Sequence, residues 1–245
     1  MILPAVEWPR VAGRIQRHWR PAQVNPHHVA YAMSRAGKDH LWRYGVLPTK
    51  PAARALVFDV KQGGDERWDA WGADIALGDW RPTMTHQRTR LRVPLGDHGA
   101  RLTRRALEAL LIVGETVVIL PDAGRITEPP GRGGLNCEGL VTRMMAEGAS
   151  HGITVLAGIN STVWASSGLK HQAGHVWLGQ TIHADMRSAF ADAAGLPKTA
   201  RPVLDTLPPH HFVYADYLDG APMLAVTKAP PARATPQTAQ PEVNP

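Results

Sequence analysis

Residues 28–44 read HVAYAMSRAGKDHLWRY. The stretch begins with a short apolar run, passes through small and polar residues to Gly37-Lys38, and ends in apolar and aromatic residues. This order predicts a strand, a loop and a helix, with the glycine–lysine pair at the first turn of the helix. Along the rest of the chain, short apolar runs alternate with helical patterns. That alternation predicts an α/β protein with a mostly parallel sheet covered by helices on both faces.

The loop is similar to the phosphate-binding P-loop, G-x-x-x-x-G-K-[ST], with two substitutions. Ala32 stands at the first glycine position, and Asp39 stands where the motif has serine or threonine. In a P-loop, backbone N–H groups surround the phosphates, the lysine neutralises them, and the hydroxyl binds Mg²⁺. The predicted nucleotide-binding residues are Ser34, Arg35, Ala36, Gly37, Lys38, Asp39 and His40.

Asp39 leaves two opposite interpretations open. A carboxylate beside phosphates repels them, but it can also bind Mg²⁺ directly, because that ion prefers hard oxygen ligands. A second acid, Asp122, follows the apolar run 116–120, where the Walker B element would lie. Aligned without a gap, Pro121 stands at the Mg²⁺-binding aspartate and Asp122 at the following glutamate, whereas a shift of one residue makes Asp122 the Mg²⁺ acid. We therefore expect Asp39 and Asp122 to serve as metal ligands, and Asp122 to act in catalysis. The structural alternative is that Asp122 only caps the loop after the strand.

In the order of these elements, residues 27–228 resemble the FtsK/HerA group of RecA-like P-loop ATPases, which are DNA-pumping motors. The small forms encoded by actinobacteria, their phages and mobile elements are particularly similar. The stretches that carry the resemblance are the lead-in to the loop (27–29), a D-x-K with a following Gly-Asp (56–65), the Walker B region (117–126), the helix and strand at 144–155, the strand end at 158–164, and two later segments (172–179 and 207–214).

The resemblance implies a RecA-like P-loop NTPase fold, ATP and Mg²⁺ as cofactors, DNA as a partner and a homo-oligomeric ring, usually a hexamer. It also implies that Asn160, which stands at the family's glutamine position, senses the γ-phosphate and acts in catalysis. In such rings the nucleotide sites lie between subunits, so an arginine acting in trans is expected. Arg143 and Arg187 are the two candidates in this chain.

Four departures from the family's pattern lie at its chemistry: Ala32, Asp39, Pro121 and Asn160. They favour an alternative function, in which the chain keeps the fold and binds DNA or a partner without hydrolysing ATP. Salt-dependent DNA binding without ATP turnover would distinguish this alternative from a motor.

The bulk composition indicates the kind of partner and the compartment. The formal net charge of +6 favours acidic partners such as nucleic acid. A single cysteine, Cys137, excludes an intramolecular disulfide and suits a reducing cytoplasm. We expect no secretory signal and no integral membrane segment. Alternating arginines at 88, 90 and 92 predict one face of a strand, which is either a phosphate-contacting patch or a solvated surface.

The chain divides into an N-terminal amphipathic helix or arm (1–26), a P-loop ATPase-like domain (27–228) and a disordered proline-rich tail (229–245). Within it, the patterns predict strands at 28–32, 55–60, 91–94, 116–120, 153–159 and 175–179, a C-terminal antiparallel hairpin of 212–215 with 223–226, helices at 8–20, 38–46, 102–113, 136–147 and 184–194, and a loop at 127–136.

Overall fold

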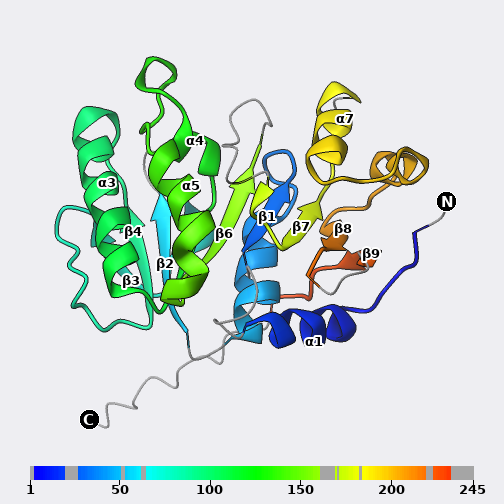
Figure 1. Ribbon diagram of the computed structural model, residues 1–245, viewed down its shortest axis with the longest axis horizontal. Coiled ribbons are helices and arrows are strands. Elements are labelled where there is room, and N and C mark those ends of the chain that lie inside the picture. Colours follow the sequence, from blue (N-terminus) through cyan, green and yellow to red (C-terminus); the bar gives the residue numbers. More distant parts are fainter. Residues whose placement is uncertain are drawn as a thin grey trace, which may run out of the picture.

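The computed structural model describes residues 3–19, 27–50, 53–61, 65–160, 169, 171–181, 184–218 and 223–232. Their centre is a nine-stranded sheet in the order β3-β4-β2-β5-β6-β1-β7-β8-β9 (Figure 1). The strands are β1 (His28–Tyr31), β2 (Arg54–Asp59), β3 (Ala73–Ala76), β4 (Arg88–Arg92), β5 (Thr116–Leu120), β6 (Thr154–Ile159), β7 (His175–Leu178), β8 (His211–Asp216) and β9 (Met223–Lys228).

The strands from β3 to β7 in this order pair in parallel, and β8 and β9 complete the sheet as an antiparallel pair. The predicted mostly parallel sheet with a C-terminal antiparallel hairpin is therefore confirmed. The helices are α1 (Trp8–His18), α2 (Lys38–His40), which continues as a π-helix (Leu41–Val46), α3 (Gly96–Val113), α4 (Ala123–Thr127), α5 (Glu138–Glu147) and α7 (Ala184–Ala193).

Helices cover both faces of the sheet, because alternate strand residues enter two separate cores. On β2, Leu56 and Phe58 pack in the core beneath α3, α5 and α7, whereas Ala55 and Val57 pack in the core beneath α1 and the π-helix. Successive side chains of a strand point to opposite faces, so a strand buried on both sides has to be apolar throughout. This explains the continuous apolar runs of the central strands. Figure 1 shows α3 and α5 along one face and α1 below the sheet.

The structure differs from the prediction at three places. β3 was not predicted, because it is a short edge strand whose residues are mostly half-buried, so its sequence shows no apolar run. The helix predicted at 102–113 begins earlier, at Gly96, because its first turn is polar and exposed. A loop was predicted over 127–136. The short helix α4 ends at Thr127, at the start of this range, and a 3-10 turn (Pro130–Arg132) lies within it.

The outer edge of β9 is covered by the N-terminal segment of the chain. Val6 N–H donates to Val226 O at 2.9 Å, and Val226 N–H donates to Pro4 O at 2.9 Å. At the other end of β9, Ala229 is buried, and the ring of His40 donates to Pro230 O at 2.7 Å. Residues 229–232 are thus attached to the folded body, and the rest of the predicted tail lies outside the described residues.

Candidate functional site

The predicted phosphate loop leaves the carboxyl end of β1, which lies between β6 and β7 near the middle of the sheet. Ala32 N–H donates to Ile159 O at 3.1 Å and Met33 N–H donates to Gln180 O at 3.2 Å, so the start of the loop is fixed to both neighbouring strand ends. Gly37 then adopts φ +96° and leads directly into α2. The loop therefore stands where open α/β sheets bind ligands, at the carboxyl ends of parallel strands.

Lys38 joins this loop to two other predicted site residues. Its Nζ donates to Ala32 O at 2.7 Å, to Met33 O at 3.0 Å and to Asn160 Oδ1 at 2.6 Å. Asn160 Nδ2 in turn donates to Asp122 Oδ1 at 3.4 Å. These side chains come from the ends of the adjacent strands β5, β6 and β1. The structure thus brings Lys38, Asn160 and Asp122 into one hydrogen-bonded row.

Asp39 faces a different partner, the guanidinium of Arg67. Arg67 Nη1 donates to Asp39 Oδ2 at 2.6 Å, whereas Oδ1 of the same carboxylate is buried without a hydrogen-bond partner among the described residues. Burial raises the pKa of Asp39 above its usual range, and the positive charge of Arg67 opposes this rise. The aspartate at the hydroxyl position of the P-loop is therefore held by an arginine of the same chain.

Arg67 was not predicted as a site residue, although it follows the D-x-K stretch that contributes to the family resemblance. It lies on a 3-10 turn (Glu66–Trp68) that follows β2, and its Nε is 3.4 Å from Asp65 Oδ1. Asp65 is also ion-paired with Lys61, and its backbone N–H donates to Asp59 Oδ2 at 2.8 Å. Residues 62–64, which include the glycines of the motif, lie outside the described residues.

The prediction that Arg88, Arg90 and Arg92 form a phosphate-contacting or solvated face is wrong for Arg90. Arg90 is 5% exposed, and its Nη2 donates to Asp59 Oδ2 at 2.8 Å. It is therefore part of the buried charge network that supports the end of β2. Arg88 and Arg92 are exposed, and Arg92 is ion-paired with Asp74 at 2.9 Å.

A cavity of about 660 Å³ opens beside the loop, within the range that holds small-molecule ligands. Four predicted site residues reach it: Arg35, Gly37, Asp39 and His40. Its other walls come from the π-helix, the turn after β2 and the entry to β8: Arg43, Tyr44, Asp65, Glu66, Arg67 and His210.

Two rings in this cavity pack against His40 at tilted angles. The His40 ring lies 4.8 Å from the ring of Tyr44 and 4.8 Å from that of His210, measured between centroids. His210 lies in the segment 207–214 that contributes to the family resemblance, but the sequence did not indicate that His210 or Tyr44 lies at this cavity. The cavity thus combines cations near the phosphate loop with flat rings on which a base can stack.

Two candidates for the arginine acting in trans are on helices. Arg143 on α5 is ion-paired with Glu147 at 2.8 Å, and Arg187 on α7 is ion-paired with Asp205. Both pairs lie outside the cavity.

The pKa of Lys38 predicts how ligand binding responds to pH. Burial lowers this pKa to about 8, against the attraction of Asp39 and Asp122, which raises it. An anionic ligand stabilises the charged ammonium, so binding above pH 8 requires proton uptake. We expect the affinity for ATP to fall up to about tenfold per pH unit between pH 8 and 10. Calorimetric titrations at pH 7, 8, 9 and 10 measure this slope, and in Lys38→Arg, which stays charged, the slope should disappear.

Gly37 is required by its conformation and by its neighbour. A Cβ at this position would lie 2.5 Å from His210 Nδ1, and φ +96° disfavours any side chain. We expect Gly37→Ala to lower the free energy of unfolding by about 1–3 kcal/mol in urea titrations. Gly96→Ala is the matched control, because Gly96 also has a positive φ, +73°, but open space around its Cβ. If both variants lose the same free energy of unfolding, the contact with His210 does not contribute to the effect of Gly37→Ala.

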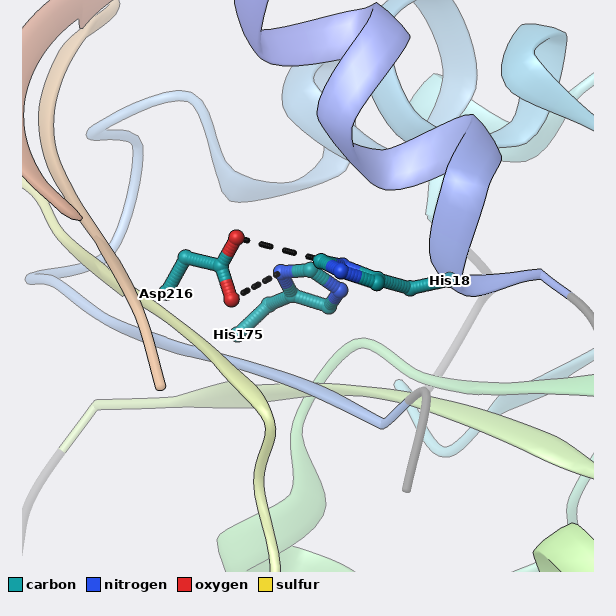
Figure 2. A group of neighbouring side chains, drawn as sticks. All are labelled: His18, His175 and Asp216. Atoms are coloured by element: carbon teal, nitrogen blue, oxygen red, sulfur yellow. Dashed lines mark ion pairs between the residues drawn. The ribbon is translucent and has the colours of Figure 1, made fainter. Parts of the chain in front are cut away.

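A second cluster of titratable groups lies at the amino end of β1. Figure 2 shows the carboxylate of Asp216 facing the neighbouring rings of His18 and His175, whose Nδ1 atoms lie 3.8 Å and 4.0 Å from its oxygens. The three residues are buried, and one ligand atom from each lies within 4.8 Å of the others, as in a metal site. However, Arg14 is already ion-paired with Asp216.

Arg14 decides how this cluster is interpreted. A divalent ion beside the partly buried Arg14 would add positive charge to a carboxylate that is already paired, and uncompensated buried charge costs several kcal/mol. In addition, Tyr214 Oη and His175 Nδ1 share a hydrogen bond of 2.9 Å. We therefore interpret the cluster as a polar network that fastens α1 to β7 and β8.

Solved structures share the fold, although comparisons with protein-family models and with curated protein sequences found no match. The DNA-packaging ATPase B204 from Sulfolobus turreted icosahedral virus gives a TM-score of 0.63 at 15% identity, over 85% of this chain and 100% of that one. The genome packaging NTPase B204 from Sulfolobus turreted icosahedral virus 2, in complex with ATP-γS, gives 0.60 at 15% identity, over 84% and 97%.

The cytoplasmic domain of the Thermomonospora curvata Type VII secretion ATPase EccC gives a TM-score of 0.53 at 12% identity, over 84% of this chain and 25% of that one. At these identities the likeness concerns the fold. The predicted P-loop NTPase fold is therefore confirmed, and so is the resemblance at the level of the fold. Among the described helices, none has the length and apolar character needed to cross a membrane.

Proposed function

We propose that this chain binds ATP at residues 34–40 and works as an FtsK/HerA-like ATPase motor. The observation that carries the proposal is the hydrogen-bonded row of Lys38, Asn160 and Asp122 at the carboxyl ends of the central strands. None of the three lines the cavity of about 660 Å³, but Gly37 and Asp39, the chain neighbours of Lys38, do. Two further facts support it: the fold is that of packaging and secretion ATPases, and one of those structures was determined with ATP-γS.

In this proposal each residue has a role that follows from its position. Lys38 exchanges its carbonyl partners Ala32 and Met33 for phosphate oxygens, and the N–H groups of residues 34–38 surround the same phosphates. Asn160 and Asp122 lie at the far side of the lysine, where the terminal phosphate and an attacking water would be oriented. The amide of Asn160 is the contact that distinguishes a triphosphate from a diphosphate.

The acids of the site fit a magnesium ion. Asp39 offers a buried oxygen, Oδ1, without a hydrogen-bond partner among the described residues, and Asp122 is the second carboxylate close enough to influence the charge of Lys38. Carboxylate oxygens are the ligands that Mg²⁺ prefers. The ion would neutralise phosphate charge, and Asp39 and Asp122 would hold it.

The motor proposal extends to DNA, a ring and the cytoplasm. The net charge of +6 suits a DNA partner, and the structurally similar B204 is a DNA-packaging ATPase. In a ring, Arg143 or Arg187 would have to leave its surface carboxylate to reach the site of the next subunit. Residues 27–228 would be the motor domain, with 1–26 and 229–245 as appendages.

Calorimetry with ATP, with and without Mg²⁺, tests this proposal first, followed by ATP turnover with duplex DNA added. ATP binding in both conditions and magnesium-dependent, DNA-stimulated hydrolysis are the expected results. A wild-type protein that binds no ATP in either condition would overturn the proposal.

One observation favours the alternative of a protein that binds DNA without hydrolysing ATP. Lys38 already has three partners within the protein, and Asp39 is ion-paired with Arg67, so both residues have partners without nucleotide. In that case DNA binding should weaken steeply with salt and be unaffected by ATP. Electrophoretic mobility shifts at several salt concentrations, with and without ATP, distinguish the two functions.

A further inference from the structure

Asp39 poses an electrostatic problem for the proposed nucleotide site. A buried carboxylate next to a polyphosphate is repelled by it, whereas the hydroxyl of an ordinary P-loop is neutral. The ordinary site needs no compensating charge at this point. This site has one, because Arg67 donates to Asp39 Oδ2 at 2.6 Å.

We propose that Arg67 is a positioning residue that neutralises Asp39 and thereby allows a polyphosphate to bind without a divalent metal. The inference rests on the proposed nucleotide site. At this site the positive charge of Arg67 compensates the negative charge that Asp39 introduces at the P-loop hydroxyl position. This pair of charges sets the metal dependence of nucleotide binding.

The charges around the loop support this role. Three cations, Lys38, Lys61 and Arg67, and three carboxylates, Asp39, Asp65 and Asp122, influence the ionisation of this cluster. Their formal balance is zero with Arg67 and one negative charge without it. Without Arg67, a phosphate group would then meet net repulsion from this cluster.

The guanidinium is positioned in advance and remains accessible. Its 3-10 turn is capped by Asp65 Oδ1, which accepts from Arg67 N–H at 3.1 Å, and is anchored by Trp68, which is 1% exposed. The Arg67 side chain itself is 40% exposed at the cavity wall. Arginine has five N–H donors, more than its contacts with Asp39 and Asp65 use.

Magnesium and Arg67 compete for the same carboxylate. With Mg²⁺ bound at Asp39, the carboxylate is neutralised whether or not the arginine is there, because Oδ1 has no hydrogen-bond partner among the described residues and can serve as the ligand. Loss of Arg67 should therefore matter little in magnesium and strongly in a chelator. This difference separates neutralisation of Asp39 from a general contribution to phosphate binding.

The experiment is a set of calorimetric ATP titrations of the full chain in Mg²⁺ and in EDTA. It compares wild type, Arg67→Gln, Asp39→Ser and the double variant. Arg67→Gln should bind ATP about 10- to 100-fold more weakly than wild type in EDTA, because it loses a charge-assisted interaction. In Mg²⁺ the loss should stay below about threefold. In the Asp39→Ser background, the same substitution should change the affinity by less than about threefold in both conditions.

Arg92→Gln is the matched control, since Arg92 is also ion-paired with an aspartate but does not line this cavity. It should leave ATP affinity unchanged in Mg²⁺ and in EDTA. The inference is overturned if Arg67→Gln weakens binding equally in Mg²⁺ and EDTA, or equally in the Asp39→Ser background. A wild type that binds no ATP in either buffer overturns the proposed function itself, and that result appears before any variant is measured.

Discussion

Lys38→Ala should lower the affinity for ATP at least about 100-fold and leave the fold intact. The ammonium group is the one charge that lies at the centre of the loop, between Ala32 O, Met33 O and Asn160 Oδ1. Charge-assisted contacts to two phosphate groups contribute about 1.5–3 kcal/mol each, and alanine loses both. Calorimetry measures the affinity, and circular dichroism with thermal unfolding measures the fold.

The fold should survive Lys38→Ala because the variant also removes a charged group whose burial is unfavourable. Burial lowers the pKa of Lys38 to about 8, so keeping the ammonium charged in this position is unfavourable in the nucleotide-free protein. Lys61→Ala is the matched control, because Lys61 is a second cation of the same cluster but is 41% exposed and paired with Asp65. Its effect on ATP affinity should stay below about tenfold. Equal affinities of Lys38→Ala and wild type would contradict the assignment of this loop as a phosphate site.

The sequence predicted the central strands because of how parallel sheets bury their residues. β5 and β6 are apolar at nearly every position, since both of their faces lie beneath helices. Where burial is one-sided or absent, the signal fails. β3 at the edge and the exposed first turn of α3 carry no such pattern, and the sequence did not show that Arg90 of β4 points into a buried charge network.

The candidate site was predictable where it follows from strand order. Asp122 and Asn160 each follow a predicted strand, and parallel strands bring their carboxyl ends to one edge, so their proximity to Lys38 could be expected. Arg67 and His210 could not be assigned in this way. Arg67 depends on the turn after β2, and His210 depends on how the entry to β8 closes over Gly37. The assigned roles of these residues in nucleotide binding remain predictions.

Asp216→Ala should lower the free energy of unfolding by about 3–5 kcal/mol, the largest stability effect we expect from a single side chain outside the apolar cores. The carboxylate is fully buried and ion-paired with Arg14 of α1, and its Oδ1 accepts the backbone N–H of Leu218 at 2.9 Å. Alanine removes the negative charge that balances Arg14 and the acceptor that fixes the end of β8. Urea titrations followed by tryptophan fluorescence measure the loss, because Trp8 begins α1 and Trp19 directly follows it.

Asp192→Ala provides the matched comparison, because Asp192 is ion-paired with Arg201 but is 64% exposed. Exposed pairs contribute about 0–1 kcal/mol, so this variant should unfold almost as wild type does. A double-mutant cycle of Asp216→Ala with Arg14→Gln should show coupling of at least about 1 kcal/mol, since the two groups compensate each other's charge. If the two losses simply add, α1 is held by its apolar residues Val11 and Ile15 alone, and the network drawn in Figure 2 does not stabilise its attachment to the sheet.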